Sequence, residues 1–335
     1  MPYTSLFFAT LILGTLISVS SSHWVFVWLG LELNLLSFIP LLASPSSSHA
    51  SEASLTYFLA QALGSGLLLL GALVTLSQPQ IFTPLSLPTL VILLGLLTKL
   101  GFPPFHFWFP SVMSLLSWPL CLLLTTWQKL TPLMLLFYSA PLKISNLLPL
   151  LISLGAIISG LGGMSQTHLR PLLAYSSMGH ISWMLAASIC SFSTSMIYLS
   201  VYMLISFPLF WLLNLYSSSS NLSSLHISSN PLILKLNLFI LMMSLGGLPP
   251  FLGFISKLLV IESLSYSFPL LIFMTMAGSL LNLYYYLNLT FINTLSNPSF
   301  SLLPSSSPSI PFMYLLLASL GALTLGLSNS IFLMM

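Results

Sequence analysis

The chain has 335 residues, of which 57% are hydrophobic and only 3% are charged, and its mean hydropathy is +1.05. Soluble domains carry about 25% charged residues, so this composition excludes an ordinary soluble protein and indicates one that crosses a membrane many times, in contact with lipid. The net charge of +3 is too small and too dispersed to indicate a nucleic-acid partner.

Hydrophobic runs and the breaks between them predict an all-α bundle of about eleven transmembrane helices, taken as a single transmembrane domain over residues 1–335. A spanning helix needs about 20 mostly apolar residues, and the runs lack the alternation of a membrane β-barrel. Three serine-rich tracts are typical of loops: Ser44–Ser54, Ser217–Asn230 and Asn297–Pro311. The predicted spans are 4–21, 24–43, 54–77, 85–117, 119–140, 145–164, 168–190, 194–216, 231–266, 269–292 and 311–333.

The N-terminal residues Met-Pro-Tyr-Thr-Ser run straight into the first apolar span. No basic or arginine-rich leader precedes it, which argues against a secretory signal and against an imported transit peptide.

Two of the predicted spans are too long for one straight crossing. Residues 85–117 contain Gly-Phe-Pro-Pro-Phe (Gly101–Phe105), and residues 231–266 contain Gly-Leu-Pro-Pro-Phe (Gly247–Phe251). Because proline lacks a backbone donor and clashes with the preceding turn, each Pro-Pro pair is expected to break its helix. Broken helices at membrane depth are typical of transporter sites.

These broken segments are the fourth and the ninth along the chain. An offset of five means that they cross the membrane in opposite directions, which predicts an inverted repeat of five-helix units. The alternative is that two proline kinks share a short motif by chance, since proline is frequent in membrane helices.

Four charged residues lie inside or beside apolar runs: Glu32, Lys99, Lys129 and Lys257. A charge at the bilayer centre costs roughly 2.5–3.5 kcal/mol, so such residues usually belong to an ion or proton pathway. Glu32 has no basic residue at i±3 or i±4, and its partner must therefore come from another helix. Lys99 and Lys257 each lie within about two helical turns of a predicted break.

Buried lysine is suited to proton transfer, because desolvation disfavours its charged form and a nearby carboxylate favours it. A Glu–Lys pair that opens and closes can thus switch the proton affinity of the next site. Three lysines against one glutamate leave two positive charges unmatched, so either some lysines are neutral or a neighbouring subunit supplies acids. The alternative is three snorkelling lysines and one satisfied glutamate, which suits helix ends such as that near Lys257 better than the position of Lys129 or Glu32.

Neutral polar residues and histidines provide possible relays: Ser176, Ser177 and His180 within one span, and His106 after the first Pro-Pro pair. Histidine can relay protons near neutral pH, but a satisfied core or interfacial histidine is an equally open interpretation. The other charges fall in loops or at span ends and are interpreted as interfacial: Glu52, Lys143, Arg170, Lys235 and Glu262.

Redox and nucleotide sites are not predicted in this chain. Cys121 and Cys190 are too few for an iron–sulfur cluster, which normally takes four cysteines, and we find neither a GxGxxG fingerprint nor a P-loop. No cofactor or metal site is therefore expected here, and any electron transfer takes place on other chains.

Three motifs together resemble the family of NADH dehydrogenase subunit 2, a mitochondrially encoded, antiporter-like membrane subunit of respiratory complex I. They are Phe-Pro-Pro-Phe-His-Phe-Trp-Phe-Pro (102–110), Leu-Ala-Tyr-Ser-Ser-Met-Gly-His (173–180) and Leu-Gly-Gly-Leu-Pro-Pro-Phe-Leu-Gly-Phe-Ile-Ser-Lys (245–257). The resemblance covers nearly the whole chain, and eleven spans match the animal form. It implies location in the mitochondrial inner membrane.

The resemblance also implies residue roles: Glu32 and Lys99 as a switching pair, Lys129 as the central lysine and Lys257 as the exit-side lysine. Many relatives carry an acid just after the His-Phe-Trp-x-Pro motif, whereas this chain has Ser111, which puts any role of that acid in doubt.

For the whole complex, the resemblance implies NADH, FMN, iron–sulfur clusters and ubiquinone, all bound by other subunits. It implies subunits 4 and 4L and accessory proteins as neighbours, with an acidic helix of subunit 4L as a source of the missing carboxylate.

The function expected from these observations is a proton-translocating subunit of NADH:ubiquinone reductase. Two alternatives stay open at this point. A free-standing cation/proton antiporter would share the broken helices and buried lysines, and a structural subunit would only anchor its neighbours.

Overall fold

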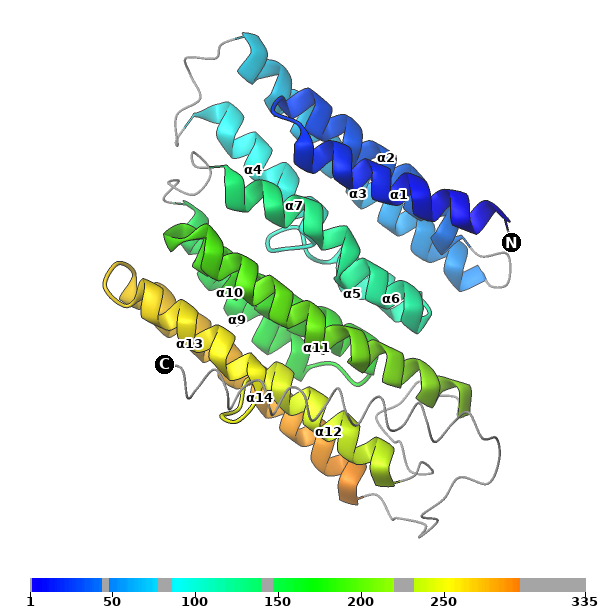
Figure 1. Ribbon diagram of the computed structural model, residues 1–335, viewed down its shortest axis with the longest axis vertical. Helices are drawn as coiled ribbons and strands as arrows, with labels where there is room; N and C mark the ends of the chain where they lie inside the picture. The colour runs from blue at the N-terminus through cyan, green and yellow to red at the C-terminus, as the bar shows by residue number, and fades with distance from the viewer. Residues whose placement is uncertain (1, 44–47, 78–85, 140–146, 220–231, 296–335) are drawn as a thin grey trace. The chain divides into compact units, whose positions relative to one another are not determined.

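A computed structural model of the chain describes residues 2–43, 48–77, 86–139, 147–219 and 232–295, and the regular structure in these ranges is entirely helical (Figure 1). Six of the described helices are long and apolar enough to cross a membrane, and three shorter apolar helices accompany them. The chain is thus an α-helical protein with multiple membrane spans. The last predicted span, 311–333, lies outside the described residues.

The helices form two compact units, each described by itself. The first comprises Met1–Gly155 with Ser188–Phe192, and the second comprises Ala156–Ala187 with Ser193–Met335. The single domain expected from the sequence stays a prediction.

The first unit is built on close helix packing around α3. Helix α1 packs on α2 and α7, and α3 packs on α2, α4 and α5. Glycines allow two backbones to approach: a Cβ on Gly14 would lie 2.9 Å from the carbonyl oxygen of Gly30. Small residues at such crossings are typical of membrane helices. The helices of this unit are α1 (Pro2–Ser20), α2 (Trp24–Leu42), α3 (Ser48–Ser77), α4 (Leu87–Leu100), α5 (Trp108–Leu115), α6 (Trp118–Thr125), α7 (Trp127–Tyr138) and the beginning of α9 (Leu147–Met164).

The second unit contains the rest of α9 and the helices that follow it. Helix α12 packs on α13 and α14, and α13 also contacts α14. Leu281 of α14 lies against Gly160 of α9, where a Cβ would approach it to 2.7 Å. The remaining helices are α10 (Leu169–Cys190), α11 (Phe192–Ser219), α12 (Leu232–Gly246), α13 (Leu252–Leu264) and α14 (Pro269–Leu295).

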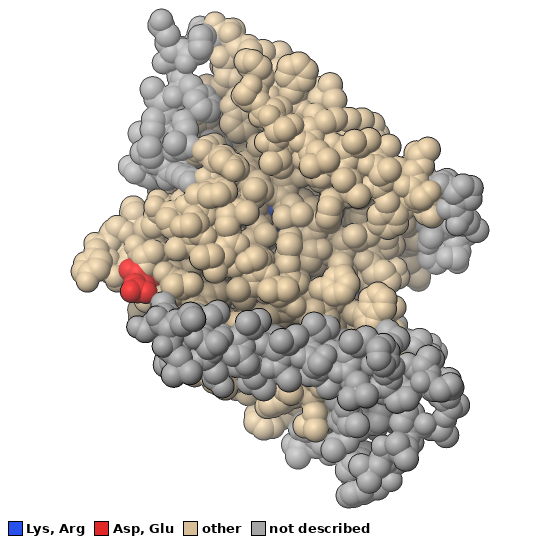
Figure 2. All heavy atoms as spheres, viewed as in Figure 1, with Lys and Arg blue, Asp and Glu red and all other residues tan. Residues whose placement is uncertain are grey.

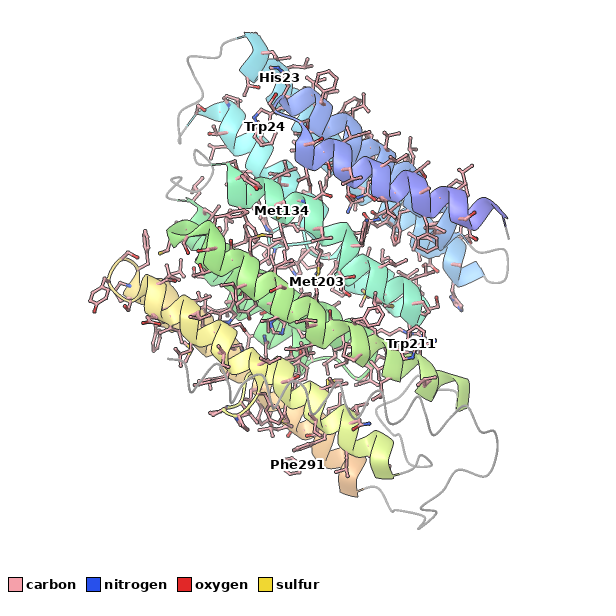
Figure 3. The ribbon with its side chains drawn as sticks, in the orientation of Figure 1. His23, Trp24, Met134, Met203, Trp211 and Phe291 are labelled. Atoms are coloured by element: carbon pink, nitrogen blue, oxygen red, sulfur yellow. The ribbon has the colours of Figure 1, made fainter. Side chains whose placement is uncertain are left out.

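Apolar side chains cover the outside of the helices, as expected of a surface in contact with lipid. Leu63 and Leu70 of α3 are 72% and 59% exposed. On α11 the exposed ring of Trp211 stacks on Phe207 (Figure 3). The face shown in Figure 2 carries almost no charged atoms. Charges buried in this protein therefore stand out against an apolar exterior.

Both predicted breaks are present, and each helix ends at a glycine rather than at the prolines. Gly101 after α4 and Gly247 after α12 have φ angles of +66° and +75°, which favour glycine. In each break the residue after the glycine donates its N–H to the carbonyl five residues back, from Phe102 to Leu97 and from Leu248 to Met243. This is the hydrogen bond of a Schellman C-cap, and the Pro-Pro pair follows where the helix has already stopped.

The predicted span 119–140 is interrupted as well, between α6 and α7. Thr126 separates the two helices, and the hydroxyls of Thr125 and Thr126 donate to carbonyls of the preceding turn. The N–H of Lys129 bonds the Thr126 carbonyl three residues back rather than the one four residues back. Pro132 has no N–H for the carbonyl at position 128. The predicted span itself is confirmed, because Trp118–Tyr138 as a whole is apolar and long enough to cross a membrane. The interruption within it was not predicted, since a single proline near threonines is a weaker signal than Pro-Pro.

The glycine at the second break provides a test of this geometry. Gly247→Ala places a Cβ in the left-handed region and 2.9 Å from Nζ of Lys257, and we expect it to destabilise the protein by about 1–2 kcal/mol. Gly246→Ala is the matched control, because its Cβ would lie 3.7 Å or more from its neighbours. The measurement is the midpoint of thermal unfolding. Equal midpoints for the two variants would contradict this account of the break.

Candidate functional site

Lys99 lies in the last turn of α4, directly before the first break, and its side chain is only 6% exposed. The carbonyls freed by the break have side-chain partners. The amide Nε2 of Gln61 donates to the Lys99 carbonyl at 3.2 Å, and the indole N–H of Trp108 donates to the Thr98 carbonyl at 3.1 Å. The break is therefore satisfied within the protein, as lipid surroundings require.

Glu32 lies near the middle of α2 and is half-buried. Its Oε1 atom is buried without a hydrogen-bond partner. The carboxylate lies close enough to Lys99 and to the hydroxyl of Tyr57 for electrostatic interaction. The structure thus brings Glu32 and Lys99 into one region.

Lys129 lies three residues beyond the interruption at Thr126 and is 4% exposed. Helix α7 is the one that carries Met134 in Figure 3. The ammonium Nζ lies 4.1 Å from the centroid of the Phe109 ring, which is a cation–π contact. Phe109 packs directly against the first break. A Cβ added at Gly101 would lie only 2.7 Å from the Cβ of Phe109, so glycine at position 101 makes this contact possible.

An amide and tyrosine network connects these helices, and sequence reasoning missed it. The Tyr57 hydroxyl donates to Oε1 of Gln128 at 3.4 Å, and Nε2 of Gln128 donates to Oδ1 of Asn34 at 3.1 Å. Tyr57 and Gln61 are four residues apart on α3, so they lie on one face. The sequence did contain a signal for this network, because Asn34 and Gln128 are polar residues in apolar runs, close to Glu32 and Lys129 respectively.

Lys257 lies in α13 of the second unit and is 7% exposed. Its Nζ donates a 2.7 Å hydrogen bond to the carbonyl of Gly246, the last residue of α12. A cation at a helix C-terminus is also favoured by the helix dipole. Lys257 does not snorkel, because it turns inward and satisfies the broken helix.

His180 lies in a buried aromatic cluster of the second unit. Its Nδ1 lies 3.0 Å from the hydroxyl of Tyr198, and its ring centroid lies 5.1 Å from that of Tyr202, next to Met203 on α11 (Figure 3). Ser176 lies close to the hydroxyls of Tyr285 and Tyr286. The cluster therefore places an imidazole and several hydroxyl groups together inside the unit.

The other predicted relay positions have more ordinary surroundings. Ser177 donates to the carbonyl of Ala174, and Ser176 donates to that of Leu173. His106 is 6% exposed between α4 and α5, and its ring is tilted by 32° against that of Phe107, with the centroids 4.2 Å apart. Ser111 is exposed on α5 and donates to the carbonyls of Phe107 and Trp108.

The charges interpreted as interfacial differ in their burial. Glu262 is exposed near the end of α13, as expected. Lys235 lies in the first turn of α12 but is only 6% exposed, so its burial was not foreseen. Lys143 lies outside the described residues. Over the ranges the structure describes, no three His, Cys, Asp or Glu side chains gather as a metal site would require.

The predicted site residues thus fall into two groups. Glu32, Lys99, Lys129 and His106 belong to the first unit, whereas Ser176, Ser177, His180 and Lys257 belong to the second. Within the first unit, α2, α4 and α7 bring Glu32, Lys99 and Lys129 around the network of Tyr57 and Gln128.

Comparison with known sequences identifies the family to which these residues belong. Residues 21–282 match a family described as the transmembrane region of NADH:quinone oxidoreductase and Mrp antiporters. The chain is 41% identical over 292 residues to NADH-ubiquinone oxidoreductase chain 2 of Lumbricus terrestris, covering 86% of both chains. The chain belongs to the NADH-ubiquinone oxidoreductase chain 2 family. The protein of that name from Canis lupus familiaris is 39% identical over 301 residues, which is 88% of this chain and 86% of that one.

Solved structures show the same fold at low identity. A chain of respiratory complex I from Thermus thermophilus matches with a TM-score of 0.77 and 24% identity, over 97% of this chain and 78% of that one. A chain of the Mrp complex from Dietzia sp. matches with a TM-score of 0.81 and 18% identity, over 97% and 74%. These likenesses show an antiporter-like fold.

The protein is therefore an antiporter-like membrane subunit of NADH:ubiquinone oxidoreductase, the respiratory complex I, in the mitochondrial inner membrane. Family membership favours this subunit over the free-standing antiporter.

Lys257 gives a stability prediction that does not depend on proton transfer. Lys257→Met leaves the buried Gly246 carbonyl without its donor, so we expect a loss of about 1–3 kcal/mol. Lys257→Arg keeps a charged donor, so this variant should retain most of the stability that Lys257→Met loses. The apparent midpoint of heat inactivation of the assembled complex measures the effect. A methionine variant as stable as the unmodified protein would show that the bond contributes nothing.

Proposed function

We propose that this subunit carries part of the proton path of complex I, with Glu32 and Lys99 as a switching pair, Lys129 as the central site and Lys257 as the exit-side site. One observation supports this most strongly: all three lysines are buried, and each lies at an interrupted helix.

An interrupted helix suits a lysine that gains and loses a proton. Freed carbonyls and small polar cavities stabilise the ammonium form, while the surrounding apolar side chains favour the neutral amine. The two opposing influences keep both forms accessible. The cation–π contact of Lys129 with Phe109 adds a stabilising term for the charged form that needs no carboxylate.

Glu32 can shift the balance between the charged and the neutral form of Lys99. When its carboxylate is near Lys99, the charged form of Lys99 is favoured, and when it withdraws, Lys99 gives up its proton more readily. The position of Glu32, within electrostatic reach of both Lys99 and the Tyr57 hydroxyl, supports this role.

We further propose that the two breaks belong to an inverted repeat of five-helix units. The shared C-cap bonds support a common origin, and so do the hydroxyls three residues before each glycine, Thr98 and Ser244, which both bond the carbonyl three residues back. His180 is the relay that the geometry supports best, because Tyr198 can orient its ring. His106, Ser176 and Ser177 are proposed as secondary relays.

The redox groups of the complex, namely NADH, FMN, iron–sulfur clusters and ubiquinone, are proposed to bind other subunits. Subunits 4 and 4L and accessory proteins are the proposed neighbours. The charge balance supports a neighbouring acid: Lys99, Lys129, Lys235 and Lys257 are buried in the described ranges, whereas Glu32 is half-buried and the other acids are exposed. Lipid contacts the remaining apolar surface.

Lys129→Met tests the proposal. The variant keeps an unbranched side chain but cannot carry a proton, so we expect proton translocation per electron to fall by the share that this subunit contributes. NADH oxidation by a soluble electron acceptor should stay unchanged. Lys143→Met, at a lysine that the sequence places between spans, is the control. Normal proton-to-electron stoichiometry in Lys129→Met would favour the purely structural role.

A further inference from the structure

The two halves of the second broken helix meet at Gly253. This residue lies in the first turn of α13, and a Cβ added to it would overlap the carbonyl oxygen of Ser244 in the last turn of α12. The added Cβ would also lie 3.5 Å from the Cα of Gly247. Because the obstructing atoms belong to the backbone, no side-chain rotation could make room for it. Only glycine therefore allows α13 to approach α12 this closely.

The contact at Gly253 determines where Lys257 lies. The two residues are four apart on α13, so they share one face of that helix. The lysine side chain passes across Gly247, where an added Cβ would lie 3.0 Å from Cδ and 2.9 Å from Nζ of Lys257. The side chain ends in the 2.7 Å hydrogen bond to the Gly246 carbonyl. Any shift of α13 away from α12 would carry the backbone of Lys257 away from that carbonyl.

The close approach is electrostatically favourable as well. The Ser244 carbonyl belongs to the negative end of α12, and Gly253 belongs to the positive end of α13. A Cα–H group that lies against a carbonyl oxygen forms a weak hydrogen bond, which recurs where helices pack closely. The same oxygen accepts the N–H of Gly247 at 3.2 Å. Both helix ends and the turn between them thus meet at one buried carbonyl.

The first break joins its two helices by different groups. The carbonyl three residues before its glycine is that of Thr98, and it accepts the indole N–H of Trp108 at 3.1 Å. The position six residues after the glycine, where the second break has Gly253, is Phe107, whose side chain is 75% exposed. Ser111, the counterpart of Lys257, is exposed and bonds carbonyls of its own helix. A buried lysine held at the end of the preceding helix is thus paired with glycine at the junction.

We propose that Gly253 is a positioning residue for Lys257. Its missing side chain lets the first turn of α13 rest on the last turn of α12, and this contact places the lysine ammonium on the Gly246 carbonyl. Gly253 takes up no proton and acts only through Lys257. The consequence for proton translocation rests on the proposed exit-side role of Lys257, whereas the positioning itself does not.

Gly253→Ala in the assembled complex tests the proposal. Because the added methyl group forces α13 away from α12, the midpoint of heat inactivation should fall, and protons translocated per electron should fall toward the level of Lys257→Met. NADH oxidation by a soluble electron acceptor should stay unchanged. Gly66→Ala on the exposed face of α3 is the matched control, because its Cβ would meet no described atom within 4 Å. If Gly253→Ala behaves like this control, the proposal is wrong.

Double variants separate positioning from simple packing. Gly253→Ala should lower the midpoint less when Lys257 is already methionine, since the bond that it disturbs is then absent. Equal losses in both backgrounds would show that the two residues act independently and would overturn the proposal. Lys257→Arg should restore part of the midpoint lost in Gly253→Ala, because the longer side chain can reach the Gly246 carbonyl from a displaced helix. Translocation should not return with it, because arginine stays protonated.

Further outcomes keep this inference distinct from the proposed function. If Lys257→Met pumps normally while arginine still rescues the stability of Gly253→Ala, the exit-side role fails and the positioning stands. If Lys257→Met stops translocation while Gly253→Ala pumps normally, only the positioning fails. Should Gly253→Ala not assemble, an experimental structure of the unmodified complex decides the question. The Gly253 Cα within about 3.6 Å of the Ser244 oxygen, with Lys257 Nζ within about 3.2 Å of the Gly246 oxygen, supports the proposal, and the absence of either contact overturns it.

Discussion

The constraint on which the rest of this structure depends is that backbone groups inside a membrane have no water to bond. An unbroken helix satisfies the constraint by itself, but α4, α6 and α12 end inside an apolar bundle and leave carbonyls free. Gln61 and Trp108 bond the carbonyls at the end of α4, threonine hydroxyls bond those at the end of α6, and Lys257 bonds the end of α12. The polar residues of the candidate site are in large part the residues that make the interruptions possible.

Much of the fold could be predicted from the sequence, because apolar runs of about 20 residues have few other stable states. The positions of Glu32, Lys99, Lys129 and Lys257 were equally accessible, since charges in apolar runs are rare. The interruption at Thr126 escaped prediction because its cause is spread over two threonine hydroxyls and Pro132, none of which breaks a helix alone.

The network of Asn34, Tyr57, Gln61 and Gln128 could not be found from the sequence for a different reason. These residues lie on α2, α3 and α7, and neutral polar side chains in a membrane helix have many possible roles. Only tertiary packing shows that they meet. The burial of Lys235 could not be found from the sequence either. Its place at the start of a helix suggested a position at the membrane interface, whereas packing in the second unit decides its exposure.

Where one helix ends and the next begins within the membrane, the short stretch of chain between them lies near two opposite partial charges. These are the negative end of the first helix dipole and the positive end of the second. Lys257 and Ser111 each lie ten residues after the positive-φ glycine of their break. Lys257 reaches back to the negative pole at the end of α12, while Ser111 lies in the first turn of α5, at a positive pole. The position ten residues after the glycine can thus hold a cation in one break and an acid in the other. Serine at position 111 leaves that pole unmatched by any charge of its own, so in this chain the two breaks differ in electrostatics although their backbones agree.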